Sequence, residues 1–128
     1  MPSLRILVVD DSPSLRRMIC ACLRAGGYLV TEAVDGDDAL ARALEAHGED
    51  ACGMLVTDQV MPGMDGLTLI RTLRGTPRYA AIPMLMLTTE ADGRIREQAR
   101  AAGASGFLAK PFDPDALMRS VAALAEPA

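Results

Sequence analysis

The sequence predicts an α/β fold in which five parallel strands form one open sheet with helices on both faces. Two observations support this fold class. Five short apolar runs alternate strictly with five longer segments of helical character, and a crossover between parallel strands normally needs a helix to return the chain. The length of 128 residues suits one domain over positions 1–128, whereas a barrel of eight strand–helix units needs about 250 residues.

The first unit begins with Arg5–Val9, a branched apolar run of the kind found in strands that are buried on both faces. Ser12 is a favoured N-cap and Pro13 a favoured first helical residue. Apolar residues then recur at helical spacing, at Leu15, Met18, Ile19, Cys22 and Leu23. Because Gly26 and Gly27 follow, the sequence predicts an amphipathic helix of about three turns.

The second unit and the third strand continue the alternation. A strand is predicted near Leu29–Ala33 and a helix from about Gly36 to His47, with Leu40 and Leu44 on its apolar face. The next apolar run predicts a strand near Gly53–Thr57.

The third helix follows the turn-rich segment Met61–Gly66 and is predicted to run to Gly75. Its apolar positions are Leu69, Ile70 and Leu73. Pro83–Leu87 predicts a fourth strand that ends at Thr88, and a helix from about Ala91 to Ala102 follows.

The fifth unit pairs a strand at Gly106–Ala109 with a last helix that opens at Asp113 and Pro114. The apolar positions of that helix are Leu117, Val121 and Leu124. No linker or low-complexity stretch interrupts the five units, so we expect no output domain within positions 1–128.

Charge and composition exclude several classes of partner. A formal net charge of −4 and a pI near 4.9 give no basic field that would hold nucleic acid or an anionic membrane. No apolar segment has the length of a signal sequence or a membrane span. Three cysteines, an odd number without framework spacing, suit a reducing compartment. The sequence therefore predicts a cytoplasmic protein.

The cysteines and the single histidine fit structural roles better than chemical ones. Cys20 and Cys22 lie two apart on a predicted helix and so point to different sides, which disfavours a shared metal. His47 falls late in the second predicted helix, where a surface or capping role is favoured over phosphotransfer.

Polar side chains follow four of the five predicted strands. Asp10 and Asp11 come after the first strand, Asp58 after the third, Thr88 after the fourth and Lys110 after the fifth. Because the carboxyl ends of parallel strands meet at one edge of the sheet, where ligands bind in such folds, we expect these side chains to converge. Each position alone is also compatible with an ordinary helix cap or a solvated charge.

The predicted cluster has the chemistry of phosphoryl transfer. Three carboxylates in one small site repel one another unless a cation lies between them, and Mg2+ prefers such oxygen ligands. Lys110 supplies a positive charge and Thr88 a hydroxyl group, the kinds of group that hold phosphoryl oxygens. The sequence thus predicts a magnesium-dependent site for phosphoryl transfer.

Four segments together resemble the receiver domains of bacterial two-component response regulators, especially the CheY-like single-domain type. These segments are Leu7–Ser12, Asp58–Gly66, Leu87–Glu90 and Ala102–Phe112. The resemblance covers essentially the whole chain and implies a flavodoxin-like sheet with strand order 2-1-3-4-5, which is taken from the family rather than worked out from the residues.

The resemblance also implies a role for each site residue. Asp58 would take a phosphoryl group from the phosphohistidine of a sensor kinase, with Thr88 and Lys110 contacting the phosphoryl oxygens. The expected Mg2+ ligands are Asp11 directly, Asp10 largely through water, Asp58, and the backbone carbonyl of Val60. No other reaction is expected beyond this self-directed transfer and the loss of the phosphoryl group, so the protein would not be an enzyme.

In the family, the movement of a residue at the position of Thr88 lets an aromatic residue, here Phe107, turn inward and reshape the fourth helix, fifth strand and fifth helix. Phe107 stands where chemotaxis receivers often have tyrosine, and a simple core role for it stays open. Val60 is apolar where fast-hydrolysing relatives often have a polar side chain that helps to position water, so we expect slower self-dephosphorylation than in a Val60→Asn variant. Thr89 would partly screen the phosphoryl group, and Glu90 would partly compensate. The family also has a cis peptide at the position of Lys110–Pro111.

Two enzyme or cofactor classes are excluded, and two alternatives to the leading function stay open. Asp10 is followed two residues later by Ser12, so the Asp-x-Asp pattern of aspartate-nucleophile phosphatases is absent. No Ser-, Thr- and Gly-rich phosphate loop for FMN follows the first strand. An intermediate receiver in a non-chemotaxis phosphorelay and a receiver-like binding module that works without phosphorylation remain.

We expect the output to pass through another protein. The chemotaxis-like segment Asp10–Met18 favours a flagellar motor switch as the target, with a histidine phosphotransferase as the second choice. A monomer is expected, with no nucleic-acid or membrane partner.

Overall fold

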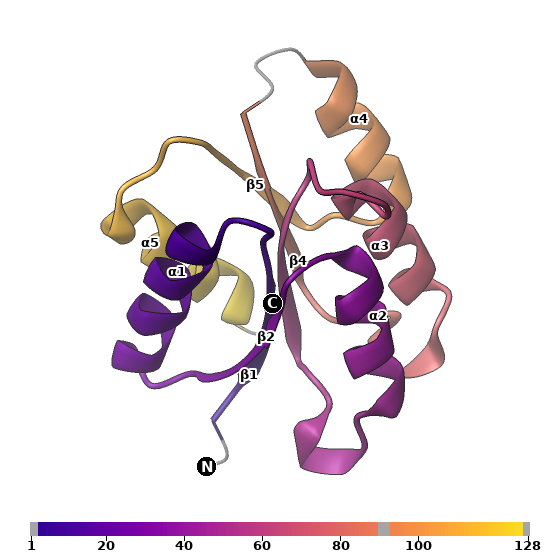
Figure 1. Ribbon diagram of the computed structural model, residues 1–128, viewed down its shortest axis with the longest axis horizontal. Coiled ribbons are helices and arrows are strands. Elements are labelled where there is room, and N and C mark those ends of the chain that lie inside the picture. Colours follow the sequence, from indigo (N-terminus) through magenta and orange to yellow (C-terminus); the bar gives the residue numbers. More distant parts are fainter. Residues whose placement is uncertain (1–2, 90–92, 127–128) are drawn as a thin grey trace.

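The computed structural model describes residues 3–89 and 93–126, which form a three-layer sandwich of helices, sheet and helices (Figure 1). All five strands are parallel and lie in the order β2-β1-β3-β4-β5, as the resemblance implied. The strands are β1 (Arg5–Val9), β2 (Leu29–Ala33), β3 (Met54–Asp58), β4 (Met84–Thr88) and β5 (Gly106–Ala109). The predicted α/β class is therefore confirmed.

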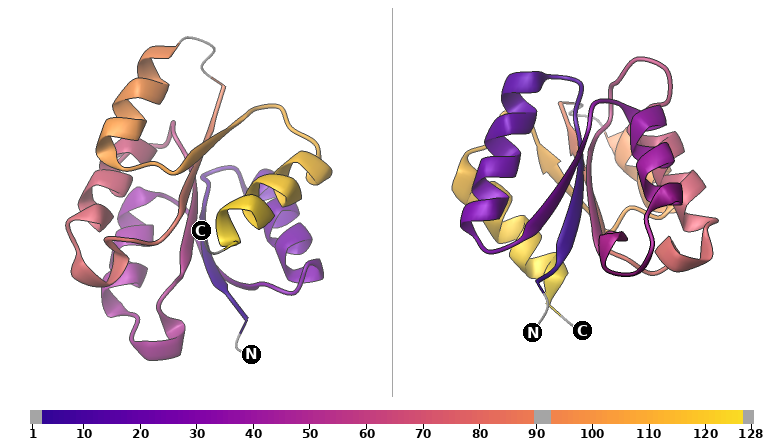
Figure 2. Two further views of the ribbon diagram at one scale, coloured as in Figure 1. Left: turned by 180° about the vertical axis from the view of Figure 1, so that it is seen from behind. Right: turned by 60° about the horizontal axis from the view of Figure 1, so that its bottom comes forward.

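The helices divide unequally between the two faces of the sheet. They are α1 (Pro13–Ala25), α2 (Gly36–Glu45), α3 (Gly66–Arg74), α4 (Gly93–Ala102) and α5 (Pro114–Ala125), with short 3-10 turns η1 (Gly48–Asp50) and η2 (Pro77–Tyr79). Helices α1 and α5 cover one face, and α2, α3 and α4 cover the other (Figures 1 and 2). Each face therefore buries its own apolar cluster against the sheet.

The strands alternate their side chains between these two clusters. On β1, Ile6 and Val8 join the α1–α5 cluster, whereas Leu7 and Val9 join the cluster under α2, α3 and α4. This period of two is the pattern expected for strands covered on both sides. The central strands β3 and β4 are buried along their whole length, so the sheet forms a rigid base for the residues at its carboxyl edge.

Side-chain caps fix where the helices begin. The hydroxyl of Ser12 accepts a hydrogen bond from Leu15 N, as its position before Pro13 predicted. The carboxylates of Asp35, Asp65 and Asp113 cap α2, α3 and α5 in the same way. All four caps lie at the carboxyl edge of the sheet, so they also set the positions of the loops that surround the candidate site.

The predicted end of the second helix is wrong by two residues. Helix α2 ends at Glu45, Ala46 is extended, and η1 follows through Gly48, whose φ of 59° is in the left-handed region. His47 is exposed and makes no side-chain cap, so its predicted surface role is confirmed and a capping role is not.

The predicted apolar face of α2 is also partly wrong. Leu44 is 48% exposed, whereas Ala39 and Ala43 are buried. Helix α2 packs closely on its surroundings, since a Cβ on Gly36 would lie 2.5 Å from the carbonyl oxygen of Met64. Small residues allow α2 to approach its neighbours this closely. A prediction of the buried face from large apolar residues alone does not detect them.

Other boundaries differ slightly from prediction. Strand β3 runs from Met54 to Asp58, so the third strand starts one residue late and includes Asp58 itself. Helix α4 begins at Gly93 among the described residues, and the predicted start at Ala91 lies outside them, as does Glu90.

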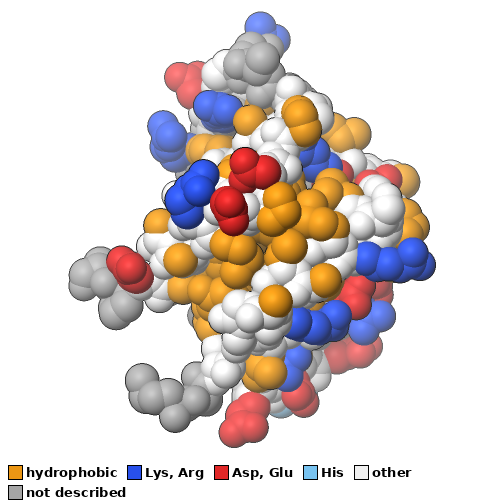
Figure 3. Space-filling model, turned by 90° about the vertical axis from the view of Figure 1, so that its left-hand side faces the viewer, with side chains coloured by type: hydrophobic (Ala, Val, Ile, Leu, Met, Phe, Trp, Pro, Cys, Tyr) orange, Lys and Arg blue, Asp and Glu red, His pale blue; other side chains and the backbone are white. Residues whose placement is uncertain are grey.

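The three cysteines are unpaired, as predicted. Burial raises the pKa of both the Cys20 and the Cys52 thiol to about 11. Figure 3 views the face of α1 and α5, where hydrophobic side chains gather between charged ones. Within residues 3–89 and 93–126, no helix is long and apolar enough to cross a membrane.

Candidate functional site

Three carboxylates meet at the carboxyl edge of the sheet. Asp10 and Asp11 follow β1, and Asp58 is the last residue of the adjacent strand β3. One oxygen from each of the three lies within 4.8 Å of the other two. Asp10 and Asp58 are buried and Asp11 is exposed, so the cluster opens to solvent on the side of Asp11. The predicted convergence of these acids is confirmed.

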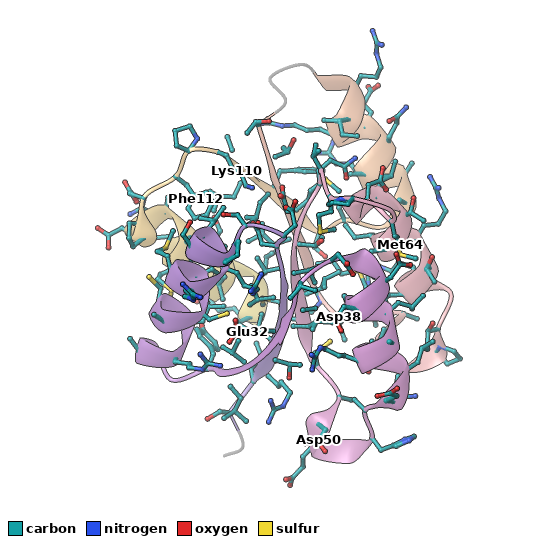
Figure 4. All side chains as sticks on the ribbon, in the orientation of Figure 1. Glu32, Asp38, Asp50, Met64, Lys110 and Phe112 are labelled. Carbon is teal, nitrogen blue, oxygen red and sulfur yellow. The ribbon has the colours of Figure 1, made fainter. Side chains whose placement is uncertain are left out.

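Lys110 brings a positive charge to two of these carboxylates. Its ammonium lies 3.0 Å from Asp58 Oδ1 and 3.5 Å from Asp10 Oδ2. The residue comes directly after β5, and its side chain reaches toward the edge of the sheet, far from Asp50 at the opposite end (Figure 4). The Lys110–Pro111 peptide bond is cis. One cation thus bridges two acids, and the side chains retain a net negative charge.

The electrostatics of Asp10 depend on these neighbours. Burial raises the pKa of its carboxyl above the ordinary value, and the charge of Asp58 acts in the same direction. The Ser12 N–H, which donates to Asp10 Oδ1 at 2.9 Å, and the ammonium of Lys110 lower that pKa. Burial is the largest of these effects, so the carboxyl of Asp10 holds its proton more tightly than a free aspartate does.

The donor set fits Mg2+. All three converging ligand groups are carboxylates, the harder oxygen ligands that Mg2+ prefers over nitrogen and sulfur. Three protein carboxylates, one of them open to solvent, leave room for the waters that Mg2+ usually keeps. The residues present are therefore compatible with the expected metal.

Thr88 lies beside this cluster at the end of β4. The residue is buried, and Leu87 before it pairs in register with Asp58 on β3. Its carbonyl accepts a hydrogen bond of 2.9 Å from Lys110 N, which ties the ends of β4 and β5 together. Thr88 and Lys110 thus lie at the same edge of the sheet as Asp58, as the sequence predicted. Val60 follows on the β3–α3 loop and is 64% exposed.

Phe107 lies on β5 under helix α4. It is half-buried and packs against the cluster shared by α2, α3 and α4. The guanidinium of Arg100 lies over its ring at 5.7 Å from the centroid, a cation–π contact. Phe107 therefore connects the strand that carries Lys110 to the surface of α4, which suits either a switch role or a core role.

Sequence reasoning missed two polar residues that support the site. Arg16 donates from Nη1 to the carbonyl of Asp10 at 2.7 Å and pairs through Nε with Glu32 at 3.3 Å. Gln59 directly follows Asp58 and is only 6% exposed. The position of Gln59 directly after a buried strand could have indicated this role, because a buried amide needs hydrogen-bond partners.

Gln59 finds those partners at the start of α3. Its Oε1 accepts from Leu67 N at 2.8 Å, and its Nε2 donates to Asp65 Oδ2 at 3.4 Å. Its backbone carbonyl accepts from Gly66 N at 3.0 Å, and its backbone N–H donates to the carbonyl of Leu87 at 3.0 Å. These bonds close the base of the loop that follows the phosphoacceptor candidate.

Gly66 packs directly on the backbone of Asp58. A Cβ at this position would lie 2.3 Å from the carbonyl oxygen of Asp58 and 3.1 Å from its carbonyl carbon. Only glycine permits α3 to begin so close to the end of β3. The first turn of α3 thus helps to fix the position of the Asp58 backbone.

Comparisons with known proteins agree with this geometry. The sequence family described as "Response regulator receiver domain" matches residues 6–122. The structure resembles the Vibrio cholerae chemotaxis protein CheY4 with a TM-score of 0.88 and 36% identity, over 95% of this chain and 98% of that one.

Two curated relatives are longer than this chain. The transcriptional regulatory protein ResD of Bacillus subtilis is 36% identical over 120 residues, which are 94% of this chain and 47% of ResD. The response regulator PleD of Caulobacter vibrioides is 42% identical over 123 residues, 95% of this chain and 26% of PleD. The chain thus spans about half or less of the length of these two relatives.

Family match, strand order and converging acids agree over nearly the whole chain. This chain belongs to the receiver domain family of two-component response regulators.

Proposed function

We propose that the protein is a phosphorylation-dependent signalling switch whose acceptor is Asp58. A carboxylate oxygen of Asp58 attacks the phosphorus of a phosphohistidine on a sensor kinase, the P–N bond breaks, and the imidazole leaves and takes up a proton. The product on this chain is an acyl phosphate. The observation that carries the proposal is the contact of 3.0 Å between Asp58 and Lys110 within a cluster of three acids.

Mg2+ is the proposed cofactor, held by Asp10, Asp11, Asp58 and the backbone carbonyl of Val60. When bound, it neutralises the charge that builds up on the phosphoryl oxygens during transfer. The protein residues do the rest. Lys110, which lies 3.0 Å from Asp58, holds one phosphoryl oxygen, and the hydroxyl of the buried Thr88 donates to another.

Signal output follows from the change in charge at Asp58. Phosphorylation replaces a carboxylate by a larger dianion, so Thr88 is drawn toward it. Because Lys110 N bonds to the carbonyl of Thr88, a shift at the end of β4 also reaches β5 and Phe107. We propose that the surface of α4, β5 and α5 then changes shape and binds a protein target.

The proposed role in chemotaxis rests on a likeness to one relative. The solved structure that resembles this chain over 98% of its own length is described as the chemotaxis protein CheY4. This supports a flagellar motor switch as the target. The second candidate, a receiver in another phosphorelay that exchanges phosphoryl groups with a histidine phosphotransferase, is favoured by the likeness to PleD and ResD, which are not described as chemotaxis proteins.

We further propose that the protein works in the cytoplasm as a monomer. Its chemistry is self-directed phosphoryl transfer and slow self-dephosphorylation, without turnover of an external substrate. The third alternative, a binding module that needs no phosphorylation, is disfavoured because each of the required acids and Lys110 is present at the site.

The test is incubation of the chain with Mg2+ and acetyl phosphate, followed by intact mass. Wild type should gain one phosphoryl group, and the gain should disappear when EDTA removes the metal. Asp58→Asn keeps the shape of the side chain and should gain none. An adduct of equal yield in Asp58→Asn would show that another residue is the acceptor.

A further inference from the structure

The backbone carbonyl of Val60 has to be held in place by other residues if it is a metal ligand. The Val60 side chain is 64% exposed, so it does not anchor the loop by burial. Its neighbour Gln59 is 6% exposed and lies between Val60 and the acceptor Asp58. Buried side chains thus flank Val60 on both sides, Gln59 before it and Met61 at 7% exposure after it, and of these two Gln59 has the amide that can form hydrogen bonds.

Gln59 closes the loop by bonding to the first turn of α3. The first N–H groups of a helix have no partner inside it, and Gln59 satisfies two of them. Its backbone carbonyl accepts from Gly66 N at 3.0 Å, and its Oε1 accepts from Leu67 N at 2.8 Å. An apolar residue at position 59 would leave the Leu67 N–H unpaired in a half-buried place.

Asp65 completes this closure from the other end of the loop. Its Oδ1 caps Thr68 N at 2.8 Å, and its Oδ2 accepts from Gln59 Nε2 at 3.4 Å. The loop is thus closed twice, by the side-chain bond between Gln59 and Asp65 and by the backbone bond between Gln59 and Gly66. These bonds hold both ends of the loop that carries the Val60 carbonyl.

We propose that Gln59 is a positioning residue for metal binding, which acts through the Val60 carbonyl and does not touch the metal. The inference rests on the proposed function, because it assumes a Mg2+ site at Asp10, Asp11 and Asp58. Residues that orient metal ligands typically change the affinity by about 10- to 100-fold when they are replaced.

The test compares wild type with Gln59→Met, which keeps the length of the side chain but removes both hydrogen bonds. Mg2+ is titrated into the unphosphorylated protein by calorimetry or by NMR of backbone amides. Gln59→Met should raise the dissociation constant about tenfold. The rate of phosphorylation by acetyl phosphate should return to within about twofold of wild type when Mg2+ is saturating, because Gln59 itself does not touch the reacting atoms.

A matched control separates this role from a general loss of stability. Tyr79→Phe removes the buried hydrogen bond of 2.6 Å from the Tyr79 hydroxyl to the carbonyl of Ala43, far from the site. Its dissociation constant for Mg2+ should equal that of wild type. If Gln59→Met also binds Mg2+ as wild type does, or if its rate stays low at saturating Mg2+, the proposal is overturned.

A second measurement uses wild type alone and so does not depend on the folding of a variant. If Gln59 and Mg2+ order the same loop, saturating Mg2+ should slow hydrogen exchange at the Leu67 and Gly66 amides. Unchanged exchange at both amides would overturn the inference. Failure of the proposed function would look different, because wild type itself would then bind no Mg2+ at the three acids.

Discussion

The contact between Gly66 and the Asp58 backbone allows a test of how closely α3 must approach the acceptor strand. In Gly66→Ala, the new Cβ would lie 2.3 Å from the carbonyl oxygen of Asp58, about 1 Å closer than the 3.4 Å at which ordinary contact begins. Both atoms belong to backbone or are fixed to it, so the overlap can be relieved only by moving α3 or the end of β3. Overpacking of this kind costs about 1–3 kcal/mol.

Gly93 provides a matched control, because it is the first residue of α4 as Gly66 is of α3. Among the residues that the structure describes, apart from its chain neighbours, a Cβ on Gly93 would meet no atom within 4 Å. Replacing a helical glycine with alanine stabilises a helix by up to about 1 kcal/mol. The difference between the two variants removes this gain, so Gly66→Ala should be about 1–3 kcal/mol less stable than Gly93→Ala.

Urea denaturation followed by circular dichroism measures both variants. Gly66→Ala should also be phosphorylated more slowly by acetyl phosphate, because movement of β3 displaces the Asp58 carboxylate, whereas Gly93→Ala should retain the wild-type rate. Stabilities that agree within about 0.5 kcal/mol would refute the claim that α3 is in close contact with the acceptor backbone.

Three other substitutions or reactions test separate parts of the account. Burial raises the pKa of Asp10 above its ordinary 3.8, so the folded state binds the proton more tightly than the unfolded state does. The free energy of unfolding without Mg2+ should therefore fall as the pH rises from 3.8 through the pKa of the folded state. Asp10→Asn should lose this pH dependence and be more stable than wild type at pH 7 in EDTA; a less stable variant in urea denaturation would contradict the sign. Val60→Asn should shorten the lifetime of the phosphoryl group, measured by its loss from purified protein, and an equal or longer lifetime would argue against a water-positioning role at this loop. Cys22 should react first with a thiol reagent at pH 8, since burial raises the thiol pKa of Cys20 and Cys52 to about 11. Peptide mapping that finds either buried cysteine labelled before Cys22 would contradict this order.

The sequence was sufficient to predict the fold and most of the site because two simple rules act together. Strands covered on both faces read as short apolar runs, and the carboxyl ends of parallel strands meet at one edge. Asp10 and Lys110 are 100 positions apart, with Asp58 about midway between them. The ammonium of Lys110 nevertheless lies within 3.5 Å of both carboxylates, because each of the three residues ends or follows a strand. The strand order required the family resemblance as well.

The misses have equally local causes. The end of α2 was placed too late because Ala46 and His47 do not oppose a helix, and the turn depends on the backbone of Gly48. Leu44 was assigned to the core because it is large, whereas the close packing of α2 selects Ala39 and Ala43. Gln59 was missed because its partners, Asp65 and Leu67, become visible only once the loop is folded.

Phe107 illustrates a role that the sequence alone left open. The structure adds Arg100, whose guanidinium lies over the face of the Phe107 ring. Sequence position gave no reason to pair these two residues, because the contact depends on how α4 lies across β5. The switch role of Phe107 stays a prediction.

The central claim is that the carboxylate of Asp58 carries the phosphoryl group, and direct mapping of the adduct tests it. Wild type is treated with acetyl phosphate and Mg2+, the acyl phosphate is reduced with borohydride to homoserine, and the modified residue is located by peptide mass spectrometry. We expect homoserine at position 58 and none at the positions of Asp10 and Asp11. Homoserine at either of those acids, or phosphoryl groups that resist borohydride, would contradict it.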